Sequence, residues 1–369
     1  MRRRLFAPDA LRGLLMVLMA LDHANFFVAQ RHSSGEMWGG PFPVYTDALP
    51  FVTRLVTYLA APGFFLLMGL GMALLGHARE EQGWTWWQIF PHFWIRGIVL
   101  MLFQILIVNR AWELSLGGWG IYIYIGVLYA LGGTMILGGL FRRLNPRYLL
   151  ALTFILFVGT ELLHPSPGLW NNIRQDPADV IFMRPGGTSV LWSYYPILPW
   201  LELVVFGMAL GKWLIADSEK AFSRMWKLGL AFLAAFVVFR ALDGFGNIRP
   251  RMGNTWIDFL NPVKYPPSMT FTLITTGVNL MLLWVFSEAK ERAQHILEPL
   301  TVFGRAALFF YVLHLFLYAG IGRLVAPKGM SIPAMLPFWL LGLVILFPLC
   351  LWYGRLKHKQ PENSPLRFL

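Results

Sequence analysis

The chain has 369 residues, of which 57% are hydrophobic and only 14% are charged. Soluble domains carry nearer to about a quarter charged residues, so this composition excludes an ordinary soluble protein. The net charge of +12 does not indicate nucleic acid as a partner, because the basic residues are spread over many short loops and form no single patch. A single cysteine, Cys350, excludes an internal disulfide and any metal site built from cysteines.

Long apolar runs follow one another along the whole chain. A helix needs about 20 apolar residues to cross the hydrocarbon core of a membrane. The sequence therefore predicts ten spans, near residues 9–29, 54–76, 91–109, 120–141, 148–163, 196–215, 226–242, 268–286, 303–325 and 333–354. We predict an all-α polytopic membrane helix bundle of about ten transmembrane helices, with residues 1–369 forming one domain. Gly69 with Gly71, and Gly207 with Gly211, predict close helix packing.

The charged loops indicate how the bundle is oriented. With the N-terminus inside, the inner segments hold nearly twice as many Lys and Arg residues as the outer ones, so both ends are predicted to be cytoplasmic. The three longest loops, near 30–53, 164–195 and 243–267, then fall on the outer side. They are rich in Pro, Gly and aromatic residues, which favours ordered caps over a pocket.

The first span carries the densest set of ionisable residues, Asp9, Arg12, Asp22 and His23. Such groups are costly in a membrane and are functional candidates by default. Arg12 and His23 are eleven residues apart and return to within about 20° of one face, while the helix rises roughly 16 Å between them. Asp9 shares this face, and Asp22 points about 100° away from His23. This pattern suits a reaction that spans the membrane. The alternative is that Arg12 snorkels and His23 makes a structural hydrogen bond.

The ninth span offers a second set of candidates. Arg305 lies at its cytoplasmic mouth, and Tyr311 and His314 share a face well inside it. Arg305 lies on roughly the opposite face from His314, so the two need not serve one group. A structural role for His314 stays as open as a catalytic one.

Further ionisable candidates lie near the ends of other spans: Arg96 at an inner end, and Arg54, Glu202, Arg240 and Lys264 at outer ends. Glu202 with Arg240 suggests a buried ion pair. Lys264 and Ser268 belong to the run Lys-Tyr-Pro-Pro-Ser, which either binds an anionic substrate group or only begins a helix.

Several motifs are missing from the sequence. It has no Gly-rich phosphate loop, no His-Glu-x-x-His zinc motif and no Gly-x-Ser-x-Gly elbow. The histidines outside the spans lack the spacing of metal ligands, so we expect no metal.

Two resemblances follow from these residues. The Leu-Arg-Gly…His pattern that contains Arg12 and His23 resembles the first helix of membrane O-acyltransferases that modify bacterial surface glycans. Over most of its length the chain is similar to bacterial membrane proteins grouped with the catalytic domain of heparan-alpha-glucosaminide N-acetyltransferase. The segments that carry this similarity are Asp9 to Gly13, Thr53 with Arg54, Ala61 to Phe64, Tyr195 to Trp200, Lys264 to Ser268 and Phe303 to His314.

The resemblance implies a bundle of ten to eleven helices, acetyl-CoA as the donor on the cytoplasmic side, and a catalytic histidine towards the far side. By position, Arg12 would help to bind the donor and His23 would be the catalytic histidine. In the heparan enzyme the essential histidine lies in the loop before the second helix. That loop holds His32 here, without the motif that surrounds the histidine in the enzyme, so His32 is the alternative base.

Together these observations predict a membrane acyltransferase that moves an acetyl or other acyl group from cytoplasmic acyl-CoA to a hydroxyl or amine of a glycan or similar acceptor. The acceptor would be reached from the periplasmic side of a bacterial inner membrane. His23 would act as general base or acyl carrier, with His32, Asp22 and His314 as further catalytic candidates. The candidates for donor binding are Arg12, Asp9, Arg96 and Arg305, and those for substrate binding are Arg54, Glu202, Arg240, Lys264, Ser268 and Tyr311.

Two rival functions stay open. The first is a transporter or flippase of a glycan or lipid, because buried charges also mark transport paths. The second is a non-catalytic partner in an envelope assembly complex. The expected partners are the lipid bilayer, acyl-CoA and a glycan or small-molecule acceptor, and the sequence allows a homodimer.

Overall fold

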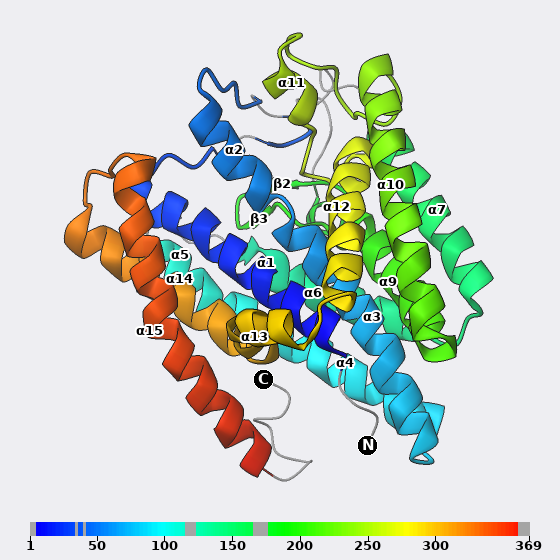
Figure 1. Cartoon of the computed structure of the whole chain (residues 1–369). Coiled ribbons are helices and arrows are strands. Elements are labelled where there is room, and N and C mark those ends of the chain that lie inside the picture. Colours follow the sequence, from blue (N-terminus) through cyan, green and yellow to red (C-terminus); the bar gives the residue numbers. More distant parts are fainter. Residues whose placement is uncertain (1–4, 34–35, 40–41, 115–122, 165–175, 361–369) are drawn as a thin grey trace.

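The computed structural model describes residues 5–33, 36–39, 42–114, 123–164 and 176–360, and it is a bundle of helices (Figure 1). Eight helical segments in these ranges are long and apolar enough to cross a membrane: Phe6–Ala29, Ala48–Glu81, Trp86–Glu113, Ile197–Ala216, Ser218–Leu242, Met269–Ser287, Ala307–Val325 and Ile332–Lys357. Two more helices, α6 (Val127–Phe141) and α7 (Pro146–Leu162), have 15 and 17 residues. Each of the ten predicted spans coincides with one of these segments. The all-α polytopic prediction is confirmed, and the chain is a multi-pass membrane protein.

Several spans consist of more than one element. The first is α1 (Phe6–Ala24) followed by the π-helical segment η1 (Asn25–Ala29). The second joins α2 (Ala48–Thr57) to α3 (Ala60–Glu81), and the third joins α4 (Trp86–Phe103), η2 (Gln104–Val108) and α5 (Asn109–Glu113). The later spans are α9 (Ile197–Ala216), α10 (Ser218–Leu242), α12 (Met269–Ser287), α14 (Ala307–Val325) and α15 (Ile332–Lys359).

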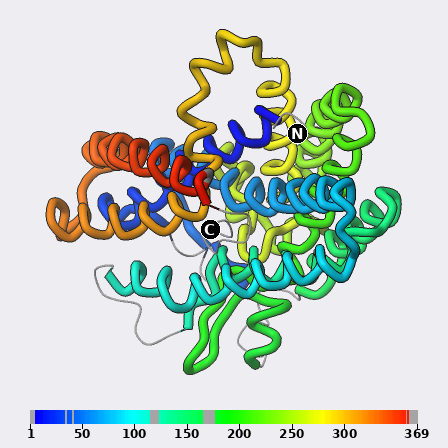
Figure 2. Tube along the Cα trace, turned by 90° about the horizontal axis from the view of Figure 1, so that it is seen from below, coloured from blue at the N-terminus to red at the C-terminus, as the bar shows by residue number. Residues whose placement is uncertain are grey.

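Helix α1 is the hub of the bundle. It contacts α2, α3, α12, α14 and α15, and it also contacts α13 (Glu291–Arg305), which the sequence analysis did not predict. Figure 2 shows α13 beside the start of α1. The predicted ninth span therefore begins later than expected, with α14 at Ala307. Two glycines let the backbones of α1 and α13 meet: a Cβ atom on Gly13 would lie 1.8 Å from the Leu300 oxygen, and one on Gly304 would lie 2.1 Å from the Asp9 oxygen.

The described parts of the loops that the sequence predicts to lie outside form a cap at one end of the bundle. Trp38 donates its backbone N–H to the Tyr265 oxygen at 2.7 Å, and Tyr265 donates to the Glu36 oxygen at 3.1 Å. The Asn261 amide donates to the Pro43 oxygen at 3.2 Å. These bonds tie the loop after α1 to the loop before α12.

Short elements that the sequence analysis did not predict complete the cap: β1 (Ile123–Ile125), β2 (Gly186–Gly187), β3 (Leu191–Ser193), α8 (Pro177–Phe182) and α11 (Trp256–Leu260). The strands form one sheet in the order β1-β3-β2, with β1 parallel to β3. In Figure 1, β2, β3 and α11 lie towards the end of the bundle opposite to the last turn of α15.

Helices α3 and α9 pack closely through three of the four glycines noted above. A Cβ atom on Gly69 would lie 1.9 Å from the Val204 oxygen, and one on Gly207 would lie 2.1 Å from the Leu66 oxygen. Gly211 is also tight, at 2.8 Å from the Leu70 oxygen. Gly71 differs, because a Cβ atom there would meet nothing within 4 Å. The prediction that Gly71 serves packing is therefore wrong, and this glycine borders open space.

We expect Gly207→Ala to destabilise the fold by about 1–3 kcal/mol, because its methyl group would force α3 and α9 apart. The matched control is Gly320→Ala in α14, where a Cβ atom also meets nothing within 4 Å. Thermal unfolding in detergent, followed by tryptophan fluorescence, measures both. Equal unfolding temperatures for Gly207→Ala and the native protein would contradict the packing described.

Candidate functional site

Both candidate base histidines line one cavity beneath the outer cap. Its volume is about 90 Å³, and His23, His32, Asp22 and Arg54 all border it. The rest of its wall is strongly aromatic and includes Trp112, Tyr124, Tyr194, Tyr195, Tyr265 and Tyr311. We call this cavity the outer pocket, after the side of the membrane on which the sequence predicts it to lie.

A larger cavity of about 530 Å³ lies on the other side of Tyr311; we call it the inner cavity. Its basic lining residues are Arg12, Arg79, His92, Arg96, Arg305 and Lys357. Most of its apolar lining residues belong to α3, α4 and α6, among them Phe64, Leu67, Met72, Leu100 and Leu128. Tyr311 borders both cavities, so the two meet at this side chain. Three of the four donor-binding candidates therefore surround one cavity, which the sequence did not reveal.

His23 is joined to His314 across the α1–α14 contact. The distance from His23 Nδ1 to His314 Nε2 is 2.6 Å, and the two rings are stacked with centroids 4.9 Å apart. His314 is fully buried, and its Nδ1 lies 3.0 Å from the Phe310 oxygen, one turn earlier in α14. The edge of Trp112 also packs against the His23 ring.

Asp22 serves partners other than His23, as its direction on the helix predicted. Its Oδ1 accepts from Arg54 Nη1 at 2.5 Å and from Thr57 Oγ1 at 2.7 Å. Its Oδ2 lies 3.4 Å from His32 Nε2. The other ring nitrogen of His32, Nδ1, is buried without a hydrogen-bond partner in the described part of the chain.

Arg54 is buried with two carboxylates. Besides Asp22, it binds Glu36 through both Nε and Nη2, and the Nε to Oε1 distance is 2.5 Å. The Tyr58 hydroxyl donates to the same Glu36 oxygen at 2.9 Å. Burial would raise the pKa of Glu36, but the Arg54 guanidinium outweighs it and holds that pKa below its usual value. The sequence analysis missed Glu36, which stands in a loop without periodicity and gave no signal.

Lys264 lies beside this network. Its ammonium group is 5.6 Å from the centre of the Tyr58 ring and 5.1 Å from that of Tyr265. Burial, together with the nearby Arg54, lowers the pKa of Lys264 to about 8, although the carboxylates of Asp22 and Glu36 act in the opposite direction.

The inner end of α1 carries a second charge cluster. Arg12 donates from Nη1 to Asp9 Oδ1 at 3.2 Å and to the Gly304 oxygen at 3.3 Å. Arg305 donates from Nε to Asp9 Oδ2 at 3.3 Å. Asp9 thus holds both arginines at the edge of the inner cavity. Across the cavity, Arg96 Nε is buried and has no hydrogen-bond partner among the described residues.

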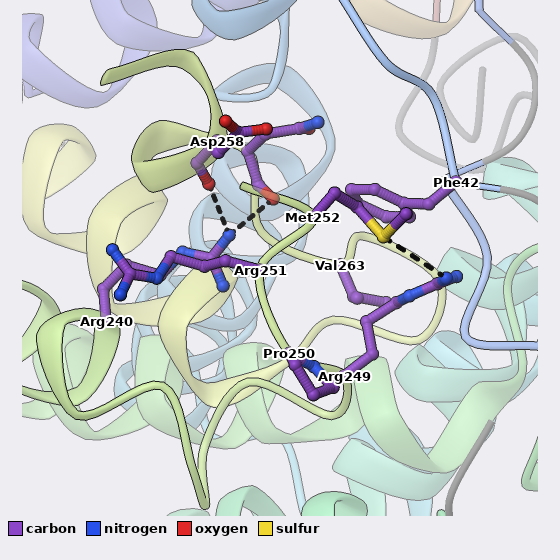
Figure 3. A pocket seen from close by; sticks show the side chains of 9 residues that line it. Phe42, Arg240, Arg249, Pro250, Arg251, Met252, Asp258 and Val263 are labelled. Carbon is purple, nitrogen blue, oxygen red and sulfur yellow. Dashed lines mark hydrogen bonds between the residues drawn. The ribbon is translucent and has the colours of Figure 1, made fainter. Parts of the chain in front are cut away.

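The expected ion pair between Glu202 and Arg240 does not form. Arg240 instead donates to the backbone oxygens of Phe259, Asp258 and Asn261 and to the side chain of Asn247. It borders a cavity of about 10 Å³ in the cap, which Arg249 and Arg251 also line (Figure 3). Glu202 accepts from the Thr272 hydroxyl at 2.8 Å. The positions of both residues near outer helix ends suggested the pair, but the cap supplies oxygen acceptors for four hydrogen bonds from Arg240.

Ser268 begins α12, where its hydroxyl accepts from the Phe271 N–H at 3.1 Å. Among the described residues that line the two main cavities, Ser268, Glu202 and Arg240 do not occur, so their contact with substrate stays a prediction. The described ranges contain no group of three or more His, Cys, Asp or Glu residues that could hold a metal ion.

Comparison with known families gives one match. The family described as heparan-alpha-glucosaminide N-acetyltransferase, catalytic, matches residues 4–241, which is well over half of the chain. The matched segment includes His23, His32 and Arg54, while α12 to α15 lie beyond it. No curated protein matches the chain. The match agrees with the resemblance drawn from the motifs, and the chain belongs to the family of the heparan-alpha-glucosaminide N-acetyltransferase catalytic domain.

Proposed function

We propose that this protein moves an acetyl or other acyl group from cytoplasmic acyl-CoA in the inner cavity to a hydroxyl or amine of an acceptor in the outer pocket. The observation that carries the proposal is the meeting of the two cavities at Tyr311, one with a basic lining and the other with histidines. The membrane would be the bacterial cytoplasmic membrane, with the outer pocket on its periplasmic side. A glycan or a similar exported molecule would supply the acceptor group.

The inner cavity suits the donor. The phosphate groups of coenzyme A are anionic, and arginine and lysine are the side chains that recognise phosphates best. Arg12, Arg96 and Arg305 border the cavity together with Arg79 and Lys357. Its apolar walls suit the uncharged arm that carries the thioester. The thioester would then reach Tyr311.

Two observations favour His23 over His32 as the base. Each histidine has one ring nitrogen occupied, His23 Nδ1 by His314 and His32 Nε2 by Asp22. Both rings line the outer pocket, but the remaining nitrogen of His32 is buried and unpartnered. His23 Nε2 has no hydrogen bond to the described residues and is not buried, so it is left for a ligand. A base must come within hydrogen-bonding distance of the proton that it abstracts.

In the proposed reaction His23 Nε2 takes the proton of the acceptor hydroxyl or amine, and the acceptor atom attacks the thioester carbonyl. The tetrahedral intermediate carries an oxyanion, to which the Tyr311 hydroxyl would donate at the junction. The carbon–sulfur bond then breaks. The thiolate of coenzyme A leaves and takes the proton from the His23 imidazolium.

Transport of a glycan or lipid is the second candidate function. It draws support from the buried charges at both ends of α1. The cavity geometry favours transfer over transport, because a glycan would have to pass from a 530 Å³ cavity through the Tyr311 junction into a pocket of about 90 Å³.

We expect Gly71→Leu to obstruct the donor, because Gly71 lines the inner cavity and a Cβ atom there would meet nothing within 4 Å. The affinity for coenzyme A should fall about tenfold or more, which corresponds to a loss of about 1.4 kcal/mol of binding free energy. Titration calorimetry with coenzyme A measures it. Gly320→Leu is the matched control and should bind as the native protein does. If Gly71→Leu bound coenzyme A as tightly as the native protein does, the donor could not bind in this cavity.

We expect His23→Ala to lower release of coenzyme A from acetyl-CoA by about 10²–10⁴-fold, the usual contribution of a general base. Glucosamine serves as the probe acceptor, and the released thiol is measured in nanodiscs. His32→Ala should keep more activity than His23→Ala. The reverse order would assign the base to His32, and absence of turnover in the native protein would favour transport.

The positive charges of Arg54 and Lys264 balance the negative charges of Asp22 and Glu36 beside the outer pocket. Because the folded protein lowers the pKa of Lys264 from 10.5 to about 8, its ammonium form destabilises the fold fully below pH 8. That cost is relieved as pH rises from 8 towards 10.5. Relative to Lys264→Met, the native protein should therefore gain about 2 kcal/mol of stability between pH 7 and 9.5. Unfolding temperatures of both proteins at these pH values test this, and a constant difference would mean that Lys264 titrates normally.

A further inference from the structure

The bond between His23 and His314 fixes where the protons lie on both rings. A neutral imidazole has one nitrogen that donates and one that accepts. His314 Nδ1 lies 3.0 Å from the Phe310 oxygen, and a carbonyl oxygen can only accept. His314 Nδ1 therefore carries the hydrogen, and His314 Nε2 carries a lone pair.

The bond to His314 also determines which nitrogen of His23 carries the hydrogen. His23 Nδ1 lies 2.6 Å from His314 Nε2. Because His314 Nε2 carries a lone pair and no hydrogen, His23 Nδ1 must donate. This leaves His23 Nε2 without a hydrogen. Protonation of His314 would reverse this assignment, but it would place a cation on a fully buried ring that bonds a carbonyl oxygen and another imidazole and forms no ion pair with the described residues. Burial of such an unpaired charge is very costly.

The surroundings hold the His314 ring in this orientation. Its ring stacks on Phe310 at 5.4 Å and meets the edges of Tyr311 at 5.5 Å and Tyr318 at 6.4 Å. The Tyr318 hydroxyl donates to the Trp339 oxygen in α15 at 2.8 Å, which fixes that edge in turn. A ring packed on three sides cannot turn over to exchange its two nitrogens.

We propose that His314 is a positioning residue that holds His23 in the tautomer with a free lone pair on Nε2, the atom left for a ligand of the outer pocket. The proposal rests on the proposed function, in which His23 is the base. When His23 takes the acceptor proton on Nε2, its Nδ1 continues to donate to His314 and His314 stays neutral. His23 then gives this proton from Nε2 to the thiolate, so both imidazoles end in the protonation states in which they began.

Two variants of His314 separate this role from simple packing. His314→Gln keeps an acceptor oxygen at about the reach of Nε2, whereas His314→Met has similar length without a comparable acceptor. We expect His314→Met to lower turnover of acetyl-CoA about 10- to 100-fold at an unchanged KM, because a misdirected catalytic group costs on that order. His314→Gln should recover most of the loss. His295→Gln, at an exposed site on α13, is the control.

Nitrogen-15 NMR of histidine-labelled protein in nanodiscs reads the tautomer without any need for activity. The native protein should show His23 with a protonated Nδ1 and a bare Nε2, and His314→Met should lose this pattern while its unfolding temperature shows that it is folded. A protonated Nε2 in the native protein, or equal turnover in His314→Met and His314→Gln, would overturn the proposal. If the tautomer is as described but His23→Ala keeps its turnover, the proposed function fails and the tautomer assignment stands.

Discussion

The outer half of the molecule depends on the ion pairs that Arg54 forms with Asp22 and Glu36. The Arg54 guanidinium is buried between Asp22 of α1 and Glu36 of the following loop, so one side chain joins a span to the cap above it. Two carboxylates at this depth could not stay charged without a cation between them, and removing one partner of a buried pair is strongly destabilising. The loop that carries Glu36 then pairs with the segment around Tyr265, which closes the outer pocket.

The inner half is organised by the same physical rule at a different place. Asp9 holds Arg12 and Arg305, because the glycines at the α1–α13 contact bring their backbones together. Helix α1 therefore has a charge cluster at each end, and the His23–His314 pair lies beside the cluster that contains Asp22. In the proposed function, an anionic donor would match the basic lining of the inner cavity, and an acceptor without that charge would match the outer pocket. The two molecules would meet only at Tyr311.

The family match places α1 to α10 in a known group but stops at residue 241. Helix α14, which supplies Tyr311 and His314, lies beyond it. Both residues nevertheless border or contact the groups inside the matched segment. The reaction centre proposed for this chain is thus built from both parts, and neither part contains it alone.

Local periodicity and apolar length determined the helical class, the places of the ten predicted helices and the shared face of Arg12 and His23, because these depend only on helix geometry and on the thickness of a membrane. Helix α13 and the strands of two or three residues could not be predicted, since α13 is too polar to resemble a span and such short strands have no pattern. The contact partners of individual side chains could not be predicted from the sequence either. Phase on a helix tells which way Arg240 or His23 points, but tertiary packing alone decides what it meets. For Arg240 that was a set of cap carbonyls instead of Glu202, and for His23 it was a histidine nearly three hundred residues later in the chain.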